Sequence, residues 1–156
     1  MNGEHIASAL PTDRAARRTF RGVYAKDETP KLPRDKKKYP LSFIVNTDRL
    51  GEPGEHWVAA YYTSPNAGEF FDSYGRAPST LGFTRKRLPG IVRVNKVKLQ
   101  SLHSNVCGQY CIYFIAMRAR GRRSAAEIFT SRSGFRRNVP EHNDVIVSKL
   151  AGNNSR

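Results

Sequence analysis

The sequence predicts one α+β domain over residues 1–156. Strand-like segments fill the first two thirds of the chain, and the strongest helical patterns come after them. Strands and helices that are segregated along the chain in this way are typical of the α+β class. With 38% hydrophobic and 26% charged residues, the composition is that of a folded protein, and the length suffices for one hydrophobic core.

The first half of the chain is expected to be mainly strand and loop. A short helix is predicted over Asp13–Phe20 after the N-cap Thr12, with a loosely ordered segment before it. The proline- and lysine-rich stretch Asp27–Tyr39 is expected to be a loop. β-Branched and aromatic runs then predict four strands, at Leu41–Asn46, His56–Thr63, Gly68–Tyr74 and Ile91–Leu99. Asn66 lies at the turn of a hairpin that joins the second of these strands to the third.

Helical periodicity dominates the rest of the chain. Apolar residues recur at intervals of three and four over Asn105–Arg120, with Ser104 or the next residue as N-cap and Gly121 at the end. Two further helices are expected at Ala125–Ser131 and Glu141–Leu150, followed by a loose C-terminal tail.

The charge is strongly positive and unevenly distributed. Lys and Arg number 27 against 13 Asp and Glu, which gives a formal net charge of +14. Residues 1–39 carry ten basic and five acidic side chains. Residues 40–75 carry one basic and five acidic side chains, and residues 76–156 carry sixteen basic and three acidic ones. This excess favours a polyanionic partner, with nucleic acid ahead of an anionic membrane. The basic residues considered for DNA contact are Lys36, Lys37, Lys38, Arg85, Lys86, Arg87, Arg118, Arg120, Arg122 and Arg123.

Membrane insertion and secretion are not expected. No apolar run approaches the roughly 18 residues of a membrane span, and the first residues lack the apolar region of a secretory signal. Two cysteines, Cys107 and Cys111, are too few for a disulfide framework and indicate a reducing compartment. No metal site and no covalent cofactor is predicted.

Cys107 is the candidate nucleophile. It lies in the first turn of the helix predicted at 105–120, where unpaired N–H groups and the helix dipole favour an anion. A histidine partner at such a site lowers a thiol pKa from about 8.5 to between about 3.5 and 7.5. Gly108 is expected to leave space for a substrate near the sulfur. A buried structural thiol is the alternative interpretation, and it suits Cys111, one turn deeper, better.

His56 and Asp72 are the candidate base and orienting acid. His56 opens one strand of the predicted hairpin and Asp72 ends the other, so their side chains are expected to meet. The carboxylate would then fix the tautomer of the imidazole and support its protonated form. A packed or surface histidine and a turn-opening aspartate are the alternatives.

Two more residues complete the candidate site. Gln100, seven residues before Cys107, would stabilise an oxyanion together with the Cys107 N–H. Trp57 either shields the His56–Asp72 pair, lines the cleft, or is an ordinary core residue.

The order His56-Trp57, Asp72, Gln100 and Cys107-Gly108 resembles that of the adenovirus protease (adenain) family and, more distantly, of the Ulp-type SUMO deconjugating proteases. Four segments are further similar to adenain: FRGVYAKDETP at 20–30, FIVNTDRLGEPGEHW at 43–57, FFDSYG at 70–75 and VCGQYCIYF at 106–114. The similarity extends over about residues 20–114.

The resemblance implies a papain-like cysteine proteinase with a central mixed sheet packed with helices, from a virus or virus-like transposon. It implies a monomeric endopeptidase that cleaves viral precursor proteins of the capsid or core at Gly-containing sites during virion maturation. Non-specific DNA is the expected activator, and the virion and the host cell nucleus are the expected locations. By the same resemblance, the catalytic residues are His56, Asp72, Gln100 and Cys107, and the substrate contacts are Trp57 and Gly108.

Two departures from the adenain pattern leave alternatives open. The acid is Asp72, as in SUMO proteases, where adenovirus enzymes carry Glu. No cysteine lies between Asp72 and Cys107, so a disulfide-linked activating peptide is not expected, and a noncovalent peptide activator stays open. The alternative functions are a Ulp-type deconjugating protease for ubiquitin-like proteins and a catalytically inactive basic DNA-binding virion protein.

Overall fold

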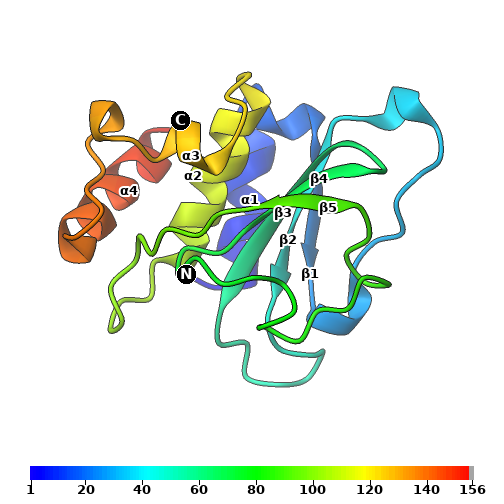
Figure 1. The fold of residues 1–156 in the computed structure, drawn as a ribbon, viewed down its shortest axis with the longest axis horizontal. Coiled ribbons are helices and arrows are strands. Elements are labelled where there is room, and N and C mark those ends of the chain that lie inside the picture. The colour runs from blue at the N-terminus through cyan, green and yellow to red at the C-terminus, as the bar shows by residue number, and fades with distance from the viewer. Residues whose placement is uncertain (155–156) are drawn as a thin grey trace.

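The structure, a computed structural model, describes residues 1–154, which form a five-stranded mixed sheet packed with helices (Figure 1). The strands lie in chain order: β1 (Phe20–Tyr24), β2 (Leu41–Asn46), β3 (Trp57–Ser64), β4 (Ala67–Phe71) and β5 (Ile91–Val94). The two outer pairs are parallel, and β2–β3 and β3–β4 are antiparallel. The helices are α1 (Gly3–Thr12), α2 (Cys107–Ala119), α3 (Ala125–Ile128) and α4 (Pro140–Asn154). The α+β prediction is confirmed.

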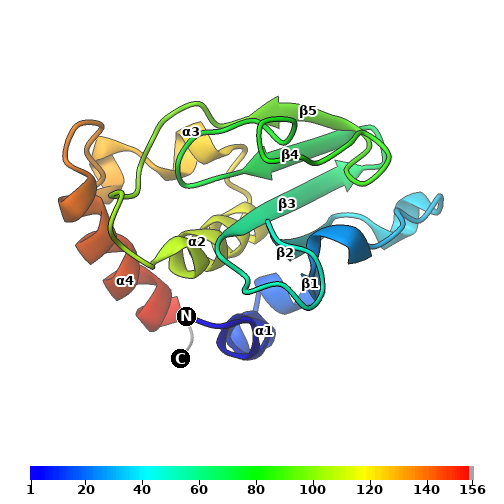
Figure 2. The ribbon, with the colours of Figure 1, turned by 90° about the horizontal axis from the view of Figure 1, so that it is seen from below.

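The two faces of the sheet are covered by different parts of the chain. On one face, Ile44 and Phe71 share a buried cluster with residues of α1, α2 and α4, and Phe71 stacks on Phe114 of α2 with ring centroids 4.8 Å apart. Figure 2 shows α2 under the sheet, with α4 on the outer side of α2. On the other face, Phe43 and Phe70 lie under loop residues that include Leu32, Phe83 and Leu88. Because both faces are covered, β2 is buried along its whole length, and four of its six residues are apolar.

The prediction for the N-terminus is wrong. The helix lies at Gly3–Thr12, in the segment expected to be loose, and not over residues 13–20. The Asn2 side chain caps α1 by accepting a hydrogen bond from the His5 N–H at 3.0 Å, and Ile6 and Leu10 are fully buried. Asp13 then ends α1, and its side chain caps the 3₁₀ turn η1 (Ala16–Arg18) that precedes β1. The sequence analysis missed β1 altogether.

Other boundaries shift for identifiable reasons. β5 ends at Val94, because the Asn95 side chain, and not the backbone ladder, then bonds to the Asp72 backbone at 2.7 and 3.0 Å. α2 begins at Cys107 after Val106, which gives no side-chain cap, so the proposed caps at 104 and 105 are wrong. α3 ends at Ile128, short of the predicted 131.

The C-terminal helix is longer than predicted. α4 extends from Pro140 to Asn154, so most of the expected loose tail is helical. The end of that predicted tail, residues 155–156, lies outside the described residues. Within residues 1–154, no helix has the length and apolar character that a membrane span needs.

Candidate active site

The β3–β4 hairpin places His56 beside Asp72. Ala59 pairs with Phe71 in this hairpin, so His56, just before β3, and Asp72, just after β4, are diagonal neighbours on one face. Nε2 of His56 lies 2.6 Å from Oδ1 of Asp72. The backbone of His56 is held as well, because its carbonyl accepts a hydrogen bond from the Thr47 N–H at 2.8 Å. The predicted contact between the two side chains is confirmed.

Asp72 is fully buried and accepts hydrogen bonds at both carboxylate oxygens. Oδ1 accepts from His56 and, at 3.2 Å, from the Tyr74 N–H. Oδ2 accepts from Arg76 twice, from its backbone N–H at 3.0 Å and from Nε at 2.8 Å. Burial raises the pKa of the Asp72 carboxyl, but the bonds from His56 and Arg76 outweigh it and lower the pKa to about 2. Asp72 is therefore a carboxylate at any physiological pH.

Helix α2 carries Cys107 as its first residue, at the helix end whose N–H groups are unpaired. Cys107 and His56 line the same cleft, and the imidazole together with the backbone N–H groups of Trp57 and Gly108 stabilises the thiolate form of Cys107. Because Nε2 of His56 is bonded to Asp72, Nδ1 is the ring nitrogen left for the sulfur. Burial raises the pKa of the thiol, but these interactions outweigh it, and the pKa lies below its usual 9.0.

His56 is shifted in the opposite direction. Burial lowers the pKa of its imidazole, but the hydrogen bonds to Asp72 and Cys107 outweigh this and raise the pKa to about 9. A raised histidine pKa beside a lowered thiol pKa favours a thiolate–imidazolium pair, which is the reactive form of a cysteine nucleophile.

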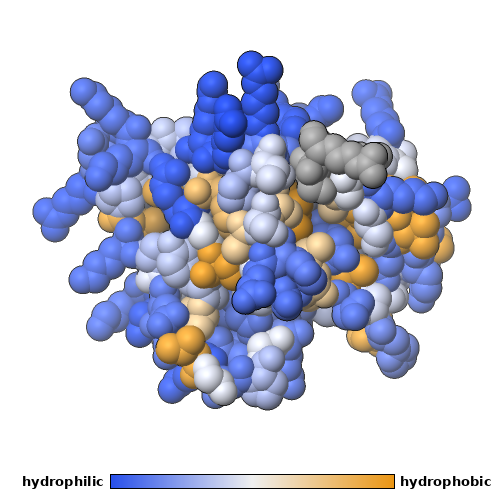
Figure 3. Space-filling model, turned by 180° about the vertical axis from the view of Figure 1, so that it is seen from behind, coloured by the Kyte–Doolittle hydropathy of each residue, from blue (hydrophilic) through white to orange (hydrophobic). Residues whose placement is uncertain are grey.

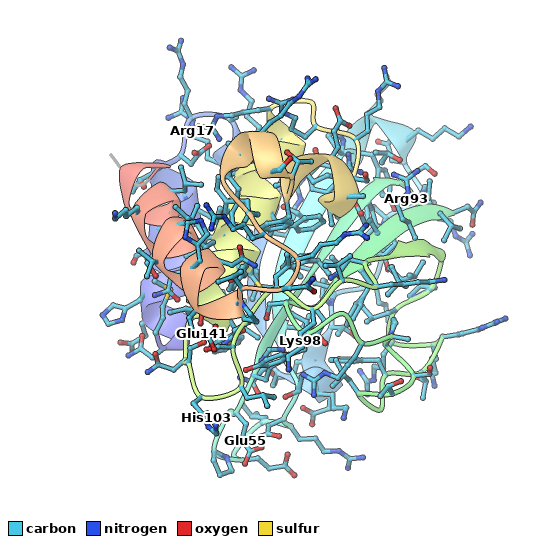
Figure 4. All side chains as sticks on the ribbon, turned by 60° about the vertical axis from the view of Figure 1, so that its left-hand side comes forward. Arg17, Glu55, Arg93, Lys98, His103 and Glu141 are labelled. Atoms are coloured by element: carbon cyan, nitrogen blue, oxygen red, sulfur yellow. The ribbon has the colours of Figure 1, made fainter. Side chains whose placement is uncertain are left out.

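These residues open into a cleft of about 400 Å³ at one end of the molecule. His56 and Cys107 line it together with Trp57, Arg76 and Gln100. Figure 4 shows Glu55, another lining residue, and His103 at this end, far from Arg17. The cleft therefore gives a substrate access to the cysteine.

Gln100 also lines the cleft, but its amide has partners. Its Oε1 accepts a hydrogen bond from the Ser73 hydroxyl at 2.6 Å. Its Nε2 donates to the carbonyl and hydroxyl of Ser104 at 3.0 and 3.1 Å. The amide nitrogen has two hydrogens, and both acceptors belong to Ser104, so donation to a substrate oxyanion would replace one of these bonds.

The two residues expected at the substrate differ in position. Trp57 lines the cleft, whereas Gly108 does not and is buried against α1. A Cβ atom at Gly108 would lie 3.0 Å from Ile6 Cδ1 and 3.1 Å from Met1 Sδ. The glycine therefore allows α1 to approach α2, and its role in leaving space for a substrate stays a prediction. Cys111 is fully buried and its thiol donates to the Trp57 carbonyl at 3.4 Å, as a structural cysteine does.

The sequence analysis missed two residues that hold Asp72 in place. Arg76 pairs with its carboxylate, and Asn95, the residue just after β5, bonds to its backbone. A signal existed for the first, because the DSYG sequence is a turn in which the Gly75 N–H donates to the Asp72 carbonyl at 2.8 Å. Gly75 has φ +74°, and a Cβ there would lie 2.9 Å from the Lys96 backbone. This turn returns the chain so that Arg76 reaches Asp72.

One of the basic residues considered for DNA contact is buried. The side chain of Arg118 is only 9% exposed, and its Nε lies 3.1 Å from Glu69 Oε1 in an ion pair without a directed hydrogen bond. Its guanidinium also stacks over the Tyr61 ring at 4.4 Å. Arg118 is therefore a structural residue and is removed from the candidates. The other nine are exposed: Lys36, Lys37, Lys38, Arg85, Lys86, Arg87, Arg120, Arg122 and Arg123.

Among residues 1–154, no group of three or more His, Cys, Asp or Glu side chains is arranged to hold a metal ion. The chain has no match among protein-family models and none among curated proteins.

Proposed function

We propose that the protein is a cysteine endopeptidase with a papain-like fold of the adenain/Ulp type. The observation that supports this most is the chain of side-chain contacts Cys107–His56–Asp72 at the edge of an open cleft. The mixed sheet packed with helices is compatible with that fold. The pKa of Cys107 is lowered and that of His56 raised, which is the direction that a nucleophile and its base require.

In the proposed mechanism, the Cys107 thiolate attacks the carbonyl carbon of the scissile peptide bond, and the electron pair moves to the oxygen. The Cys107 N–H and the Gln100 amide donate hydrogen bonds to this oxyanion. His56 then protonates the leaving amine as the C–N bond breaks, which gives a thioester. Water then gives a proton to His56 and attacks the thioester carbonyl, and the C–S bond breaks, which releases the carboxylic acid product and regenerates the thiolate–imidazolium pair. Asp72 holds the imidazole throughout.

The substrates and partners in this proposal come from the resemblance and from charge. Viral precursor proteins and Gly-containing cleavage sites follow from the resemblance to adenain. Assistance by DNA has independent support, because a net charge of +14 favours sequence-independent binding to phosphates.

The test is cleavage of a fluorogenic Leu-x-Gly-Gly peptide by the wild type, by Cys107→Ala and by the matched control Cys111→Ala, each with and without duplex DNA. We expect cleavage by the wild type and the control, faster with DNA, and none by Cys107→Ala. DNA-independent cleavage, together with hydrolysis of a ubiquitin-like C-terminal probe, would favour the deconjugating function. Binding of DNA without any cleavage would favour the inactive virion protein.

A further inference from the structure

A second cavity, of about 780 Å³, is surrounded by basic side chains. Six of them line it: Arg14, Arg18, Arg21, Lys37, Lys38 and Arg120. They come from three segments, namely residues 14–21, which reach into the start of β1, the turn η3 (Lys36–Lys38) and the C-terminal end of α2. We call this cavity the basic groove.

The basic groove lies at the opposite end of the molecule from the cleft. α2 begins with Cys107 at the cleft, and its last residue, Ala119, lines the groove. Thirteen residues of helix separate the two sites by about 18 Å. β2 likewise begins next to Pro40 at the groove and ends at the cleft side. In Figure 1 the end of α2 is at the top, and in Figure 3 long hydrophilic side chains project from that edge.

The fold brings the two basic segments of the sequence together here. Five of the groove cations belong to residues 1–39, and Arg120 belongs to residues 76–156. The acidic segment 40–75 instead supplies Asp48, Glu52 and Glu55, in the loop before His56 at the cleft end. The groove is thus built from the basic parts of the sequence, while the loop with these three acids lies at the cleft end.

Two of the groove arginines are held in place by the protein. Arg21 donates to the carbonyls of Arg18 and Lys38, each at 3.2 Å, and so links two walls of the groove. Arg120 forms a two-point ion pair with the buried Asp13, at 2.7 and 3.1 Å. Arg21 is therefore a pre-positioned cation for a phosphate, whereas the charge of Arg120 is balanced by the Asp13 carboxylate. Arg14 and Lys37 add exposed positive charge beside them.

We propose that the basic groove binds the phosphate backbone of duplex DNA. This rests on the proposed function insofar as the DNA is the activator of the peptidase. Backbone binding needs cations at several phosphates and no base contacts, which agrees with a groove of arginines and lysines. DNA held at this end leaves the cleft free for a protein substrate, and the acidic loop at the cleft end repels the duplex.

The test compares two triple variants in the Cys107→Ala background, in which binding is measured without cleavage. One removes Arg14, Arg18 and Lys38 from the groove, and the matched control removes Arg132, Arg136 and Arg137, which do not line the groove, all by substitution with Gln. All six side chains are exposed, so both variants should fold, which circular dichroism checks. Fluorescence anisotropy with a labelled duplex, over a series of salt concentrations, gives the affinity and its salt dependence.

We expect the groove variant to reduce the slope of log K against log salt by about 3, one unit per lost cation. Its affinity at 0.1 M salt should fall by about 10²- to 10³-fold, while the control changes little. Equal losses in both variants would overturn the proposal, since binding would then depend only on overall charge. Unchanged binding by the groove variant would also overturn it.

A third arm uses inorganic tripolyphosphate as the ligand. Tight binding of tripolyphosphate without binding of DNA would show that the groove binds a small polyanion and not a duplex, which would overturn the proposal. None of these results depends on peptidase activity. If DNA binds in the groove but no peptide is cleaved, the proposed function is wrong and DNA binding by the groove is supported. If peptide is cleaved but DNA does not bind, the proposed function is supported and DNA binding by the groove is wrong.

Discussion

Charged side chains at the two ends of helix α2 lie in opposite environments. At its start, Cys107, His56 and Asp72 are buried and hydrogen-bonded in series, and the pKa values of all three move away from their ordinary values. Near its end, Arg14 and Lys37 are exposed around the basic groove. Buried, directly bonded charges depend strongly on each partner, whereas exposed charges are screened and contribute in small, nearly additive amounts.

This comparison teaches how to interpret any single substitution. Removal of one member at the cleft leaves another buried charge without its partner, which is costly. Removal of one cation at the groove takes away about one phosphate contact and leaves the others unchanged. We therefore expect abrupt losses at the cleft and graded losses at the groove.

The largest effect is expected from Asp72→Asn. The amide removes the negative charge that holds the His56 imidazolium, and it brings an NH₂ group into a site where Tyr74 and Arg76 both donate. By analogy with other catalytic triads, peptide cleavage should fall by up to about 10⁴-fold. The measurement is kcat/KM on the fluorogenic peptide.

The control for this variant is Glu55→Gln, which removes an exposed acid that lines the same cleft. It should leave kcat/KM within about twofold of the wild type. An Asp72→Asn protein that keeps most of its activity would show that the buried charges at the cleft do not act as a unit.

The second effect separates two arginines of the same basic run. Arg118→Met leaves Glu69 buried without its ion-pair partner, because both side chains are almost fully covered. The free energy of unfolding should fall by about 3–5 kcal/mol. Arg122→Met, at an exposed position, should change it by less than about 0.5 kcal/mol. Urea unfolding measures both, and similar values for the two variants would contradict the structural role of Arg118.

These two arginines show where sequence reasoning ends. Both belong to one basic run, and nothing local distinguishes them. What separates them is Glu69 on β4 and Tyr61 on β3, which are distant in the chain. The hairpin contact between His56 and Asp72 was predictable, because turn residues and strand alternation specify it locally.

The N-terminal helix was missed for a related reason. α1 has few local signals, and its stability comes from burying Ile6 and Leu10 against the rest of the core. Gly108 then has a packing role that its position beside the nucleophile concealed. The basic groove was out of reach as well, because it is assembled from three segments far apart in the sequence.

The third effect concerns the pH dependence of Cys107. The His56 imidazolium is lost only as pH rises through about 9, while the thiolate is present once pH exceeds the lowered pKa of Cys107. Alkylation by iodoacetamide at pH 6.5 should therefore be about tenfold or more faster in the wild type than in His56→Ala, whose thiol returns toward about 8.5. The rate is followed by mass spectrometry.

Cys111 serves as the internal control for alkylation. It is fully buried, and burial raises its pKa, so the folded wild type should take up one alkyl group and Cys107→Ala none. The raised pKa of His56 also makes the stability of the fold depend on pH. The stability that His56 contributes is fully present below about pH 6.5 and is lost as pH rises through about 9. Equal alkylation rates in wild type and His56→Ala would refute the ion pair.

The smallest effect is expected from Tyr110→Phe, which tests how α4 supports the cleft. The Tyr110 hydroxyl donates to Asp144 Oδ1 at 2.9 Å. Asp144 also accepts from the Ser101 hydroxyl at 2.7 Å, and so holds the segment that follows Gln100. Loss of one of these bonds should lower the free energy of unfolding by about 1–2 kcal/mol. Cleavage should change by less than about twofold, because the bond between Ser101 and Asp144 remains.

Asp144→Ala removes both bonds and distinguishes support of the cleft from general stability. It should lower kcat together with stability, because Ser101, next to Gln100, then loses its bonds to α4 and only the bond from Asn143 to the Leu99 carbonyl remains. The informative quantity is the ratio of the loss of kcat to the loss of stability. If Tyr110→Phe and Asp144→Ala reduce kcat by the same factor under conditions in which the two variants are equally stable, the only role of α4 is to stabilise the fold. A selective loss of kcat in Asp144→Ala would show that α4, like the start of α2, supplies buried side chains on which the cleft depends.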